Sequence, residues 1–138
     1  MKWVPVVLML TTSFLVEAQE LQDIKYPSSA DNTMQSAMFH DPEPEQPVPL
    51  VVALHTWSGD YRQKHHEAIR EWCMKKGWAY IHPDFRGPAR RPEATGSELV
   101  IGDIVSAVAH ARKVTKIDSE AVFLVAVSYT HLTLPTKA

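Results

Sequence analysis

The sequence contains a single cysteine, Cys73, and no run of lysine and arginine residues that forms a basic stripe. One cysteine excludes an intrachain disulfide and leaves the redox compartment undetermined. Without a basic stripe, and with a formal net charge of -2, the chain offers no support for nucleic-acid binding. It also lacks internal repeats and low-complexity segments. With 138 residues, 45% of them hydrophobic and 22% charged, it has the composition of an ordinary globular domain.

The N-terminus lacks a hydrophobic run long enough for a membrane span. Its apolar stretch, from Trp3 to about Val16, is roughly 14 residues long, whereas a bilayer requires ~20. A lysine precedes the stretch, and the sequence VEA that ends at Ala18 fits a small-x-small cleavage site. We therefore expect residues 1–18 to be a signal peptide, with no stable membrane insertion after its removal and a secreted or periplasmic destination. A membrane anchor is the alternative.

The remaining sequence alternates apolar strands with amphipathic helices. Residues 19–48 are expected to hold one or more N-terminal strands, with "TMQSAMFH" as an edge strand, and a proline-rich connection, "DPEPEQPVP". In residues 49–126 the apolar runs "PLVVALH", "WAYIHP" and "AVFLVAV" indicate three buried strands, separated by two helices. Gly77 ends the first helix and Ser97 caps the second. The apolar residues at helical spacing are Ala68, Ile69, Trp72 and Cys73 in the first helix, and Leu99, Ile101, Ile104, Val105, Val108 and Ala111 in the second.

Strands that are apolar on both faces and alternate with helices predict an α/β fold with a mostly parallel sheet flanked by helices. Such sheets carry their functional sites at the carboxyl ends of the strands. This rule selects three places: residues 55–59, residues 82–88 and Ser128.

The segments "LVVALHTWSGDYRQ", "WAYIHPDFRGP" and "GDIVSAVAHAR", followed by "VFLVAVS", resemble the α/β-hydrolase superfamily, specifically the prolyl-oligopeptidase-like serine hydrolases and their esterase relatives. The resemblance covers about Asp23 to Ser128. It implies the N-terminal part of an α/β-hydrolase fold, truncated at the nucleophile strand. It also implies a peptide or small ester substrate, and neither cofactor nor metal. Ser128 takes the nucleophile position, and the backbone N–H groups of Thr56, Trp57 and Tyr129 take the oxyanion hole.

Two motifs depart from the family pattern. Thr56 replaces a glycine, and the nucleophile elbow reads AVSYT around Ser128, without the two glycines that relieve crowding in this sharp turn. The following "HLTLPT" is interrupted by Pro135 and does not form the expected helix. One reading frame of a transposase library adapter encodes "VSYTHLTLPT". We therefore expect residues 127–138 to be a non-native tail, with a genuine divergent elbow as the alternative.

A serine hydrolase of this fold places its acid and its histidine after the nucleophile. Only 10 residues follow Ser128, and His131 lies too close to serve as the base. The hypothesis is therefore a fragment of an exported serine hydrolase that acts through an acyl-enzyme and is inactive as given. The alternative is a non-catalytic binding or scaffold protein of the same fold. A metal-dependent or nucleotide-binding protein is weaker, because no glycine-rich loop follows a strand. Substrate and oligomeric state stay undetermined.

Several other side chains have structural interpretations that outweigh functional ones. His65 and His66 point in different directions on a helix, which favours solvated surface over a metal site. Cys73 lies on an apolar helix face, which indicates a packed thiol. The remaining expectations are a structural pair between Asp84 and Arg86, an oxyanion loop shaped by His55, and a Trp57 that lines a cleft or packs over the loop.

Overall fold

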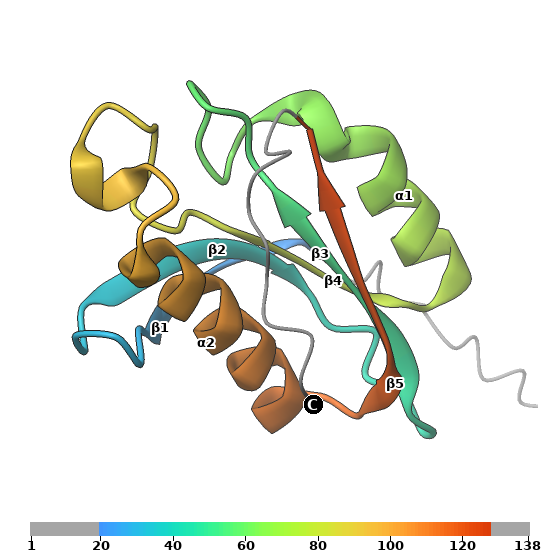
Figure 1. The fold of residues 1–138 in the computed structure, drawn as a ribbon. Coiled ribbons are helices and arrows are strands. Elements are labelled where there is room, and N and C mark those ends of the chain that lie inside the picture. Colours follow the sequence, from blue (N-terminus) through green and yellow to red (C-terminus); the bar gives the residue numbers. More distant parts are fainter. Residues whose placement is uncertain (1–19, 128–138) are drawn as a thin grey trace, which may run out of the picture.

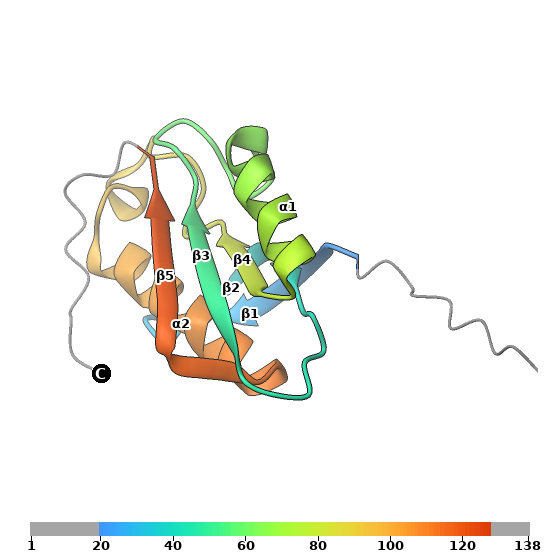
Figure 2. The ribbon, with the colours of Figure 1, turned by 90° about the vertical axis from the view of Figure 1, so that its right-hand side faces the viewer.

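The computed structural model describes residues 20–127, so the expected signal peptide, Ser128, Tyr129 and the rest of the tail lie outside the described residues. Within that range the chain forms one five-stranded sheet with a helix on each face (Figures 1 and 2). The strands are β1 (Gln22–Pro27), β2 (Met34–His40), β3 (Val48–Leu54), β4 (Ala79–Pro83) and β5 (Ile117–Ala126). The helices are α1 (Glu67–Lys76) and α2 (Glu98–Val114), and two 3-10 turns span Lys64–His66 and Pro92–Ala94.

The strand order is β1-β2-β4-β3-β5. Strand β3 is parallel to β4 and to β5, so the predicted parallel core of the sheet is confirmed. Strands β1 and β2 form an antiparallel hairpin, and β2 pairs antiparallel with β4. The prediction that residues 33–40 form an edge strand was wrong, because β1 covers that edge. The sequence did not predict the position of β1, because Tyr26 is its only fully buried side chain and the strand therefore has no apolar pattern.

The two faces of β3 are buried against different helices, as expected for a strand that is apolar throughout. Leu50, Val52 and Leu54 belong to the larger core, which α2 covers, whereas Val51 and Ala53 pack beneath α1. Figure 2 shows the two helices on opposite sides of the sheet. Because both faces of β3 are dry, this strand provides a rigid base for the loop at its carboxyl end.

Both helices begin or end with the predicted residues. The Ser97 side chain caps α2 by accepting a hydrogen bond from the Val100 N–H at 3.3 Å. Gly77 ends α1 in the left-handed conformation, with φ of 66°. No helix within residues 20–127 is long and apolar enough to cross a membrane.

The helix faces differ in part from the prediction. Helix α2 buries Val100, Ile104, Ala107 and Ala111, whereas Val105 is 48% exposed. The exposed Val105 and the half-buried Val108 of α2 line an apolar groove of ≈ 500 Å³ beside Val122 and Leu124 of β5. Trp72 of α1 also lies outside the core, 43% exposed, with its ring edge-on to Trp78 at 4.8 Å.

Candidate functional site

The register of the parallel strands β3 and β5 ends both strands at the same edge of the sheet. Leu54, the last residue of β3, pairs with Ala126, the last residue of β5. Thr56 and position 128 therefore each follow a paired strand end by two residues. Ser128 and Tyr129 lie outside the described residues, so the structure places only the loop after β3 and the strand that precedes Ser128 in the sequence.

His55 connects this loop to the one that follows β4. Its ring is fully buried and stacks on Phe85, with ring centroids 3.9 Å apart. Its Nε2 lies 2.6 Å from the carbonyl oxygen of Asp84, and its Nδ1 lies 2.9 Å from the carbonyl oxygen of Thr56. These contacts agree with the expected role of His55 in shaping the loop, because its ring contacts the backbone of the loop after β3 at Thr56 and that of the loop after β4 at Asp84.

Thr56 and Trp57 are both in the loop that the sequence selected. The Thr56 N–H and Oγ1–H donate to Oε1 of Gln63, at 3.3 Å and 2.9 Å. The Trp57 carbonyl accepts a hydrogen bond from the Ala89 N–H at 2.8 Å, and the Trp57 side chain is 52% exposed. The backbone of this loop is therefore held from two sides, while the indole lies at the surface of the carboxyl edge.

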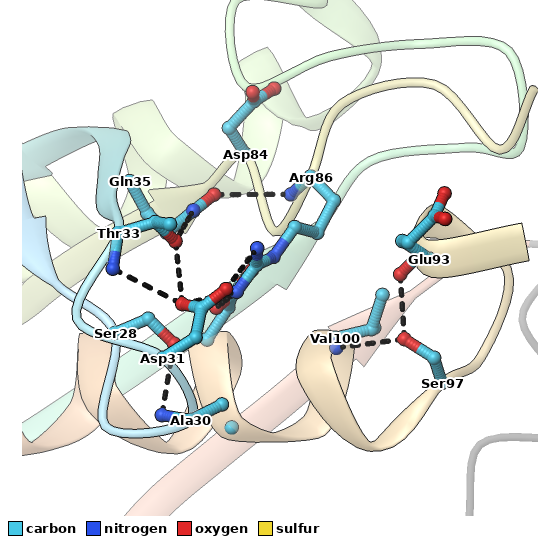
Figure 3. A network of polar contacts seen from close by, with 12 residues as sticks. Ser28, Ala30, Asp31, Thr33, Gln35, Asp84, Arg86, Glu93, Ser97 and Val100 are labelled. Carbon is cyan, nitrogen blue, oxygen red and sulfur yellow. Dashed lines mark hydrogen bonds and ion pairs between the residues drawn. The ribbon is translucent and has the colours of Figure 1, made fainter. Parts of the chain in front are cut away.

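The predicted pair between Asp84 and Arg86 was wrong. Figure 3 shows the Asp84 carboxylate turned away from the Arg86 guanidinium. Arg86 instead forms bidentate ion pairs with Asp103 of α2, at 2.7 Å and 3.0 Å, and with Asp31 of the β1–β2 turn, at 2.8 Å and 2.9 Å. Sequence reasoning missed both partners because they lie far away in the chain.

The role of Arg86 is structural. Hydrogen bonding to Arg86 holds the pKa of the Asp31 carboxyl well below its usual range. The Arg86 N–H also donates to Oε1 of Gln35 in β2, at 3.2 Å. One side chain thus joins the β1–β2 hairpin, the loop after β4 and helix α2.

Asp84 lies differently in the same loop. Burial raises its pKa, and its Oδ1 accepts a hydrogen bond from the Tyr61 N–H at 3.3 Å. Asp84 therefore helps to hold the loop after β3 against the loop after β4. No arginine pairs with it within the part of the chain that the structure describes.

The histidine prediction holds for one residue of two. His65 is exposed, but His66 is buried and its Nε2 lies 2.8 Å from the Leu54 carbonyl oxygen, so the solvated-surface prediction was wrong for His66. Its ring stands edge-on to that of His82, 5.4 Å away. Burial lowers the pKa of His82 to about 3, so this ring is neutral at physiological pH.

The other thiol and metal expectations can be compared directly with the structure. Cys73 is a fully buried free cysteine whose pKa is raised to about 11 by burial, which confirms the packed thiol. Among residues 20–127, no three histidine, cysteine, aspartate or glutamate side chains are grouped so that they could hold a metal ion.

The strand order, the antiparallel first pair and the helices on both faces define the chain as an α/β-hydrolase fold. Among solved structures, an esterase from Pyrococcus furiosus is 18% identical with a TM-score of 0.59, over 78% of this chain and 42% of the esterase chain. An S-formylglutathione hydrolase from Staphylococcus aureus is 14% identical with a TM-score of 0.61, over 78% of this chain and 47% of that chain. An acylaminoacyl peptidase from Pyrococcus horikoshii is 15% identical with a TM-score of 0.59, over 80% of this chain and 19% of the peptidase.

The predicted α/β-hydrolase fold is thus confirmed, and at 14% to 18% identity these structures show the fold alone. The chain spans less than half of the length of each of these structures. No family model and no curated protein sequence matches the chain.

Proposed function

We propose that this chain is the N-terminal part of an exported serine hydrolase that cleaves peptide or ester bonds through an acyl-enzyme intermediate. The observation that carries the proposal is the register between Leu54 and Ala126. Because these two residues are paired, β3 and β5 end side by side at the carboxyl edge of the sheet. In this fold the nucleophile and the donors of the oxyanion hole follow the ends of these two strands.

In the proposed reaction, the nucleophilic oxygen at position 128 attacks the substrate carbonyl carbon while a histidine takes its proton. The carbonyl oxygen becomes an oxyanion, held by backbone N–H groups near Thr56 and Trp57 and by that of the residue after the nucleophile. We assign the Trp57 N–H as the first donor, because Trp57 is the third residue after the end of β3 and lies in the loop at the carboxyl end of that strand. The proton then passes to the leaving group, and water releases the acyl group. The histidine and its acid would come from later strands of the complete reading frame.

The test begins by amplifying the locus and sequencing the product directly, without library adapters. The complete reading frame is then expressed, and the protein is treated with a fluorophosphonate probe. We expect one label, on a serine directly after β5, and its loss when that serine is changed to alanine. Hydrolysis of a p-nitrophenyl ester and of an N-acylaminoacyl anilide would then separate esterase from peptidase. A folded protein that takes no label would refute the proposal.

The second candidate is a non-catalytic binding or scaffold protein of the same fold. The replacement of a glycine by Thr56 and an elbow without glycine around Ser128 favour it. In this case the authentic sequence would retain AVSYT, and no aspartate and histidine would follow the later strands. Resequencing tests the tail directly: a glycine codon at position 126 supports the enzyme and the adapter origin of residues 127–138, whereas a confirmed "VSYTHLTLPT" supports the scaffold.

A further inference from the structure

We propose that Gln63 is a positioning residue for the oxyanion loop. Its side-chain oxygen holds the backbone of residues 56–59 in the conformation that presents the Trp57 N–H to the substrate. This inference deepens the proposed function and rests on it. It is carried by contacts of five residues between β3 and α1: His55, Thr56, Gly59, Asp60 and Gln63.

The first contacts fix the peptide plane that precedes Thr56. Oε1 of Gln63 accepts from both the Thr56 N–H, at 3.3 Å, and the Thr56 hydroxyl, at 2.9 Å. The orientation of the Gln63 amide follows from these contacts, because the opposite orientation would set its NH₂ group against the donating Thr56 N–H. The Gln63 N–H in turn donates to the Asp60 carbonyl at 3.1 Å, so the residue is also held from its own backbone.

A second set of contacts fixes the next peptide plane. The Thr56 carbonyl accepts from the Gly59 N–H at 3.0 Å and lies 2.9 Å from Nδ1 of His55. In a trans peptide the N–H of the following residue points opposite to that carbonyl. The direction of the Trp57 N–H is therefore set by the contacts of the Thr56 carbonyl oxygen, and the position of Thr56 itself is set by Gln63.

Gly59 makes this arrangement possible. A Cβ at position 59 would lie 1.9 Å from Oε1 and 2.8 Å from Cδ of Gln63, and 3.0 Å from Oγ1 of Thr56. The Gln63 amide thus occupies the space that any other residue at position 59 would fill. Thr56, Gly59 and Gln63 fit together as one unit, and the threonine that replaces the family glycine is the residue that provides the hydroxyl contact.

The arrangement also leaves one polar group without a partner. Gln63 Nε2 is buried and has no hydrogen-bond partner among the described residues. An unsatisfied buried donor is unfavourable for stability. The contacts of the Gln63 amide in this turn are therefore those of its oxygen, which accepts from Thr56.

The experiment uses the complete, fluorophosphonate-reactive protein and measures kcat and KM for an ester substrate. Gln63→Met keeps the side-chain size but removes the accepting oxygen. We expect kcat to fall about tenfold or more while KM changes less than about twofold, since only transition-state stabilisation is lost. The matched control is Lys64→Met at the exposed neighbouring position, which should leave both constants unchanged.

Thr56 variants separate positioning from a general packing effect. Thr56→Ser keeps the hydroxyl and should retain a higher kcat than Thr56→Val, which removes the hydroxyl and should lower kcat. If Gln63 acts through Thr56, the Thr56→Val, Gln63→Met double variant should lose little more than the worse single variant. Independent losses that multiply would overturn the inference, as would a wild-type kcat in Gln63→Met.

Two further measurements keep the inference testable if Gln63→Met does not fold. Thr56→Val retains the Gln63 amide and its N–H contact, and a wild-type kcat in this variant would count against the proposal. A crystal structure of a phosphonate adduct should show the adduct oxygen at the Trp57 N–H with Gln63 still bonded to Thr56. A wild-type protein without labelling would refute the proposed function, whereas an active wild type with unaffected variants would refute only the role of Gln63.

Discussion

Arg86 and Asp103 form a bidentate ion pair, 2.7 Å and 3.0 Å between their nitrogen and oxygen atoms, across 17 positions of the chain. The Asp103 side chain is fully buried and that of Arg86 is 10% exposed. Asp31 completes the guanidinium shell from the β1–β2 turn (Figure 3). This pair attaches α2 to the loop after β4, and so it helps to fix that loop at the carboxyl edge of the sheet.

Asp103→Asn should destabilise the complete protein by about 3–5 kcal/mol, since removal of one partner leaves the other charge buried and under-compensated. Urea unfolding at neutral pH measures this change. The matched control is Asp31→Asn, which removes a partner that is one-third exposed and should cost clearly less. Equal losses in the two variants would contradict the assignment of Asp103 as the main partner.

Acid should destabilise the protein in part through His82. The pKa of this ring is lowered to about 3 in the folded protein, below its ordinary value of 6.5, so the unfolded chain binds a proton first. The contribution of His82 is therefore fully present above pH 6.5 and is lost as the pH falls towards 3. The difference in unfolding free energy between pH 7 and pH 4, measured with urea, should be smaller in His82→Gln than in wild type. His65→Gln, at an exposed position, should leave the difference unchanged.

Cys73 should be unreactive in the folded protein. Its thiol is fully buried and its pKa is raised to about 11, which lowers the thiolate fraction. We expect modification by a thiol reagent at pH 8 to be at least about a hundredfold slower than in denaturant. Rapid labelling of the native protein, with activity and melting temperature unchanged, would show that α1 opens readily above β3.

We propose that the intact protein is exported and cut after Ala18, so that the mature chain starts at Gln19. The motivation is the apolar run followed by VEA in residues 1–18. Mass spectrometry of the N-terminal peptide of the natural protein checks this. A natural protein that retains Met1 would contradict both the cleavage site and the secreted or periplasmic assignment.

A polypeptide of residues 19–138 is expected to self-associate. Strand β5 is the edge of the described sheet, and its Phe123 and Leu124 are 48% and 42% exposed on opposite faces. Apolar edge strands pair with other chains. Size-exclusion chromatography should show large species that decrease with Leu124→Lys. A monodisperse, cooperatively melting polypeptide would contradict the expectation.

The elements with a strong local pattern could be predicted from the sequence. Apolar runs indicated β3, β4 and β5, and helical spacing with Ser97 and Gly77 indicated α1 and α2 with their ends. The alternation of strands and helices was sufficient to predict a parallel sheet. Because such sheets carry their sites at the carboxyl ends of the strands, this topology predicted a site in the loop at Thr56. These features follow from hydrophobic periodicity and capping, which act over a few residues.

Tertiary structure decided the features that depend on distant partners. The edge position of β1 depends on its pairing with β2 and not on an apolar pattern of its own. The contact of His66 with the Leu54 carbonyl and the pairing of Arg86 with Asp103 and Asp31 involve residues 12, 17 and 55 positions away in the chain. The hydrogen bonds between Thr56 and Gln63 could not be predicted from the sequence either, because only the folded turn brings the Gln63 amide into the space left by Gly59. Local patterns determine which segments become strands and helices, but burial and the pairing of charges are properties of the packed chain.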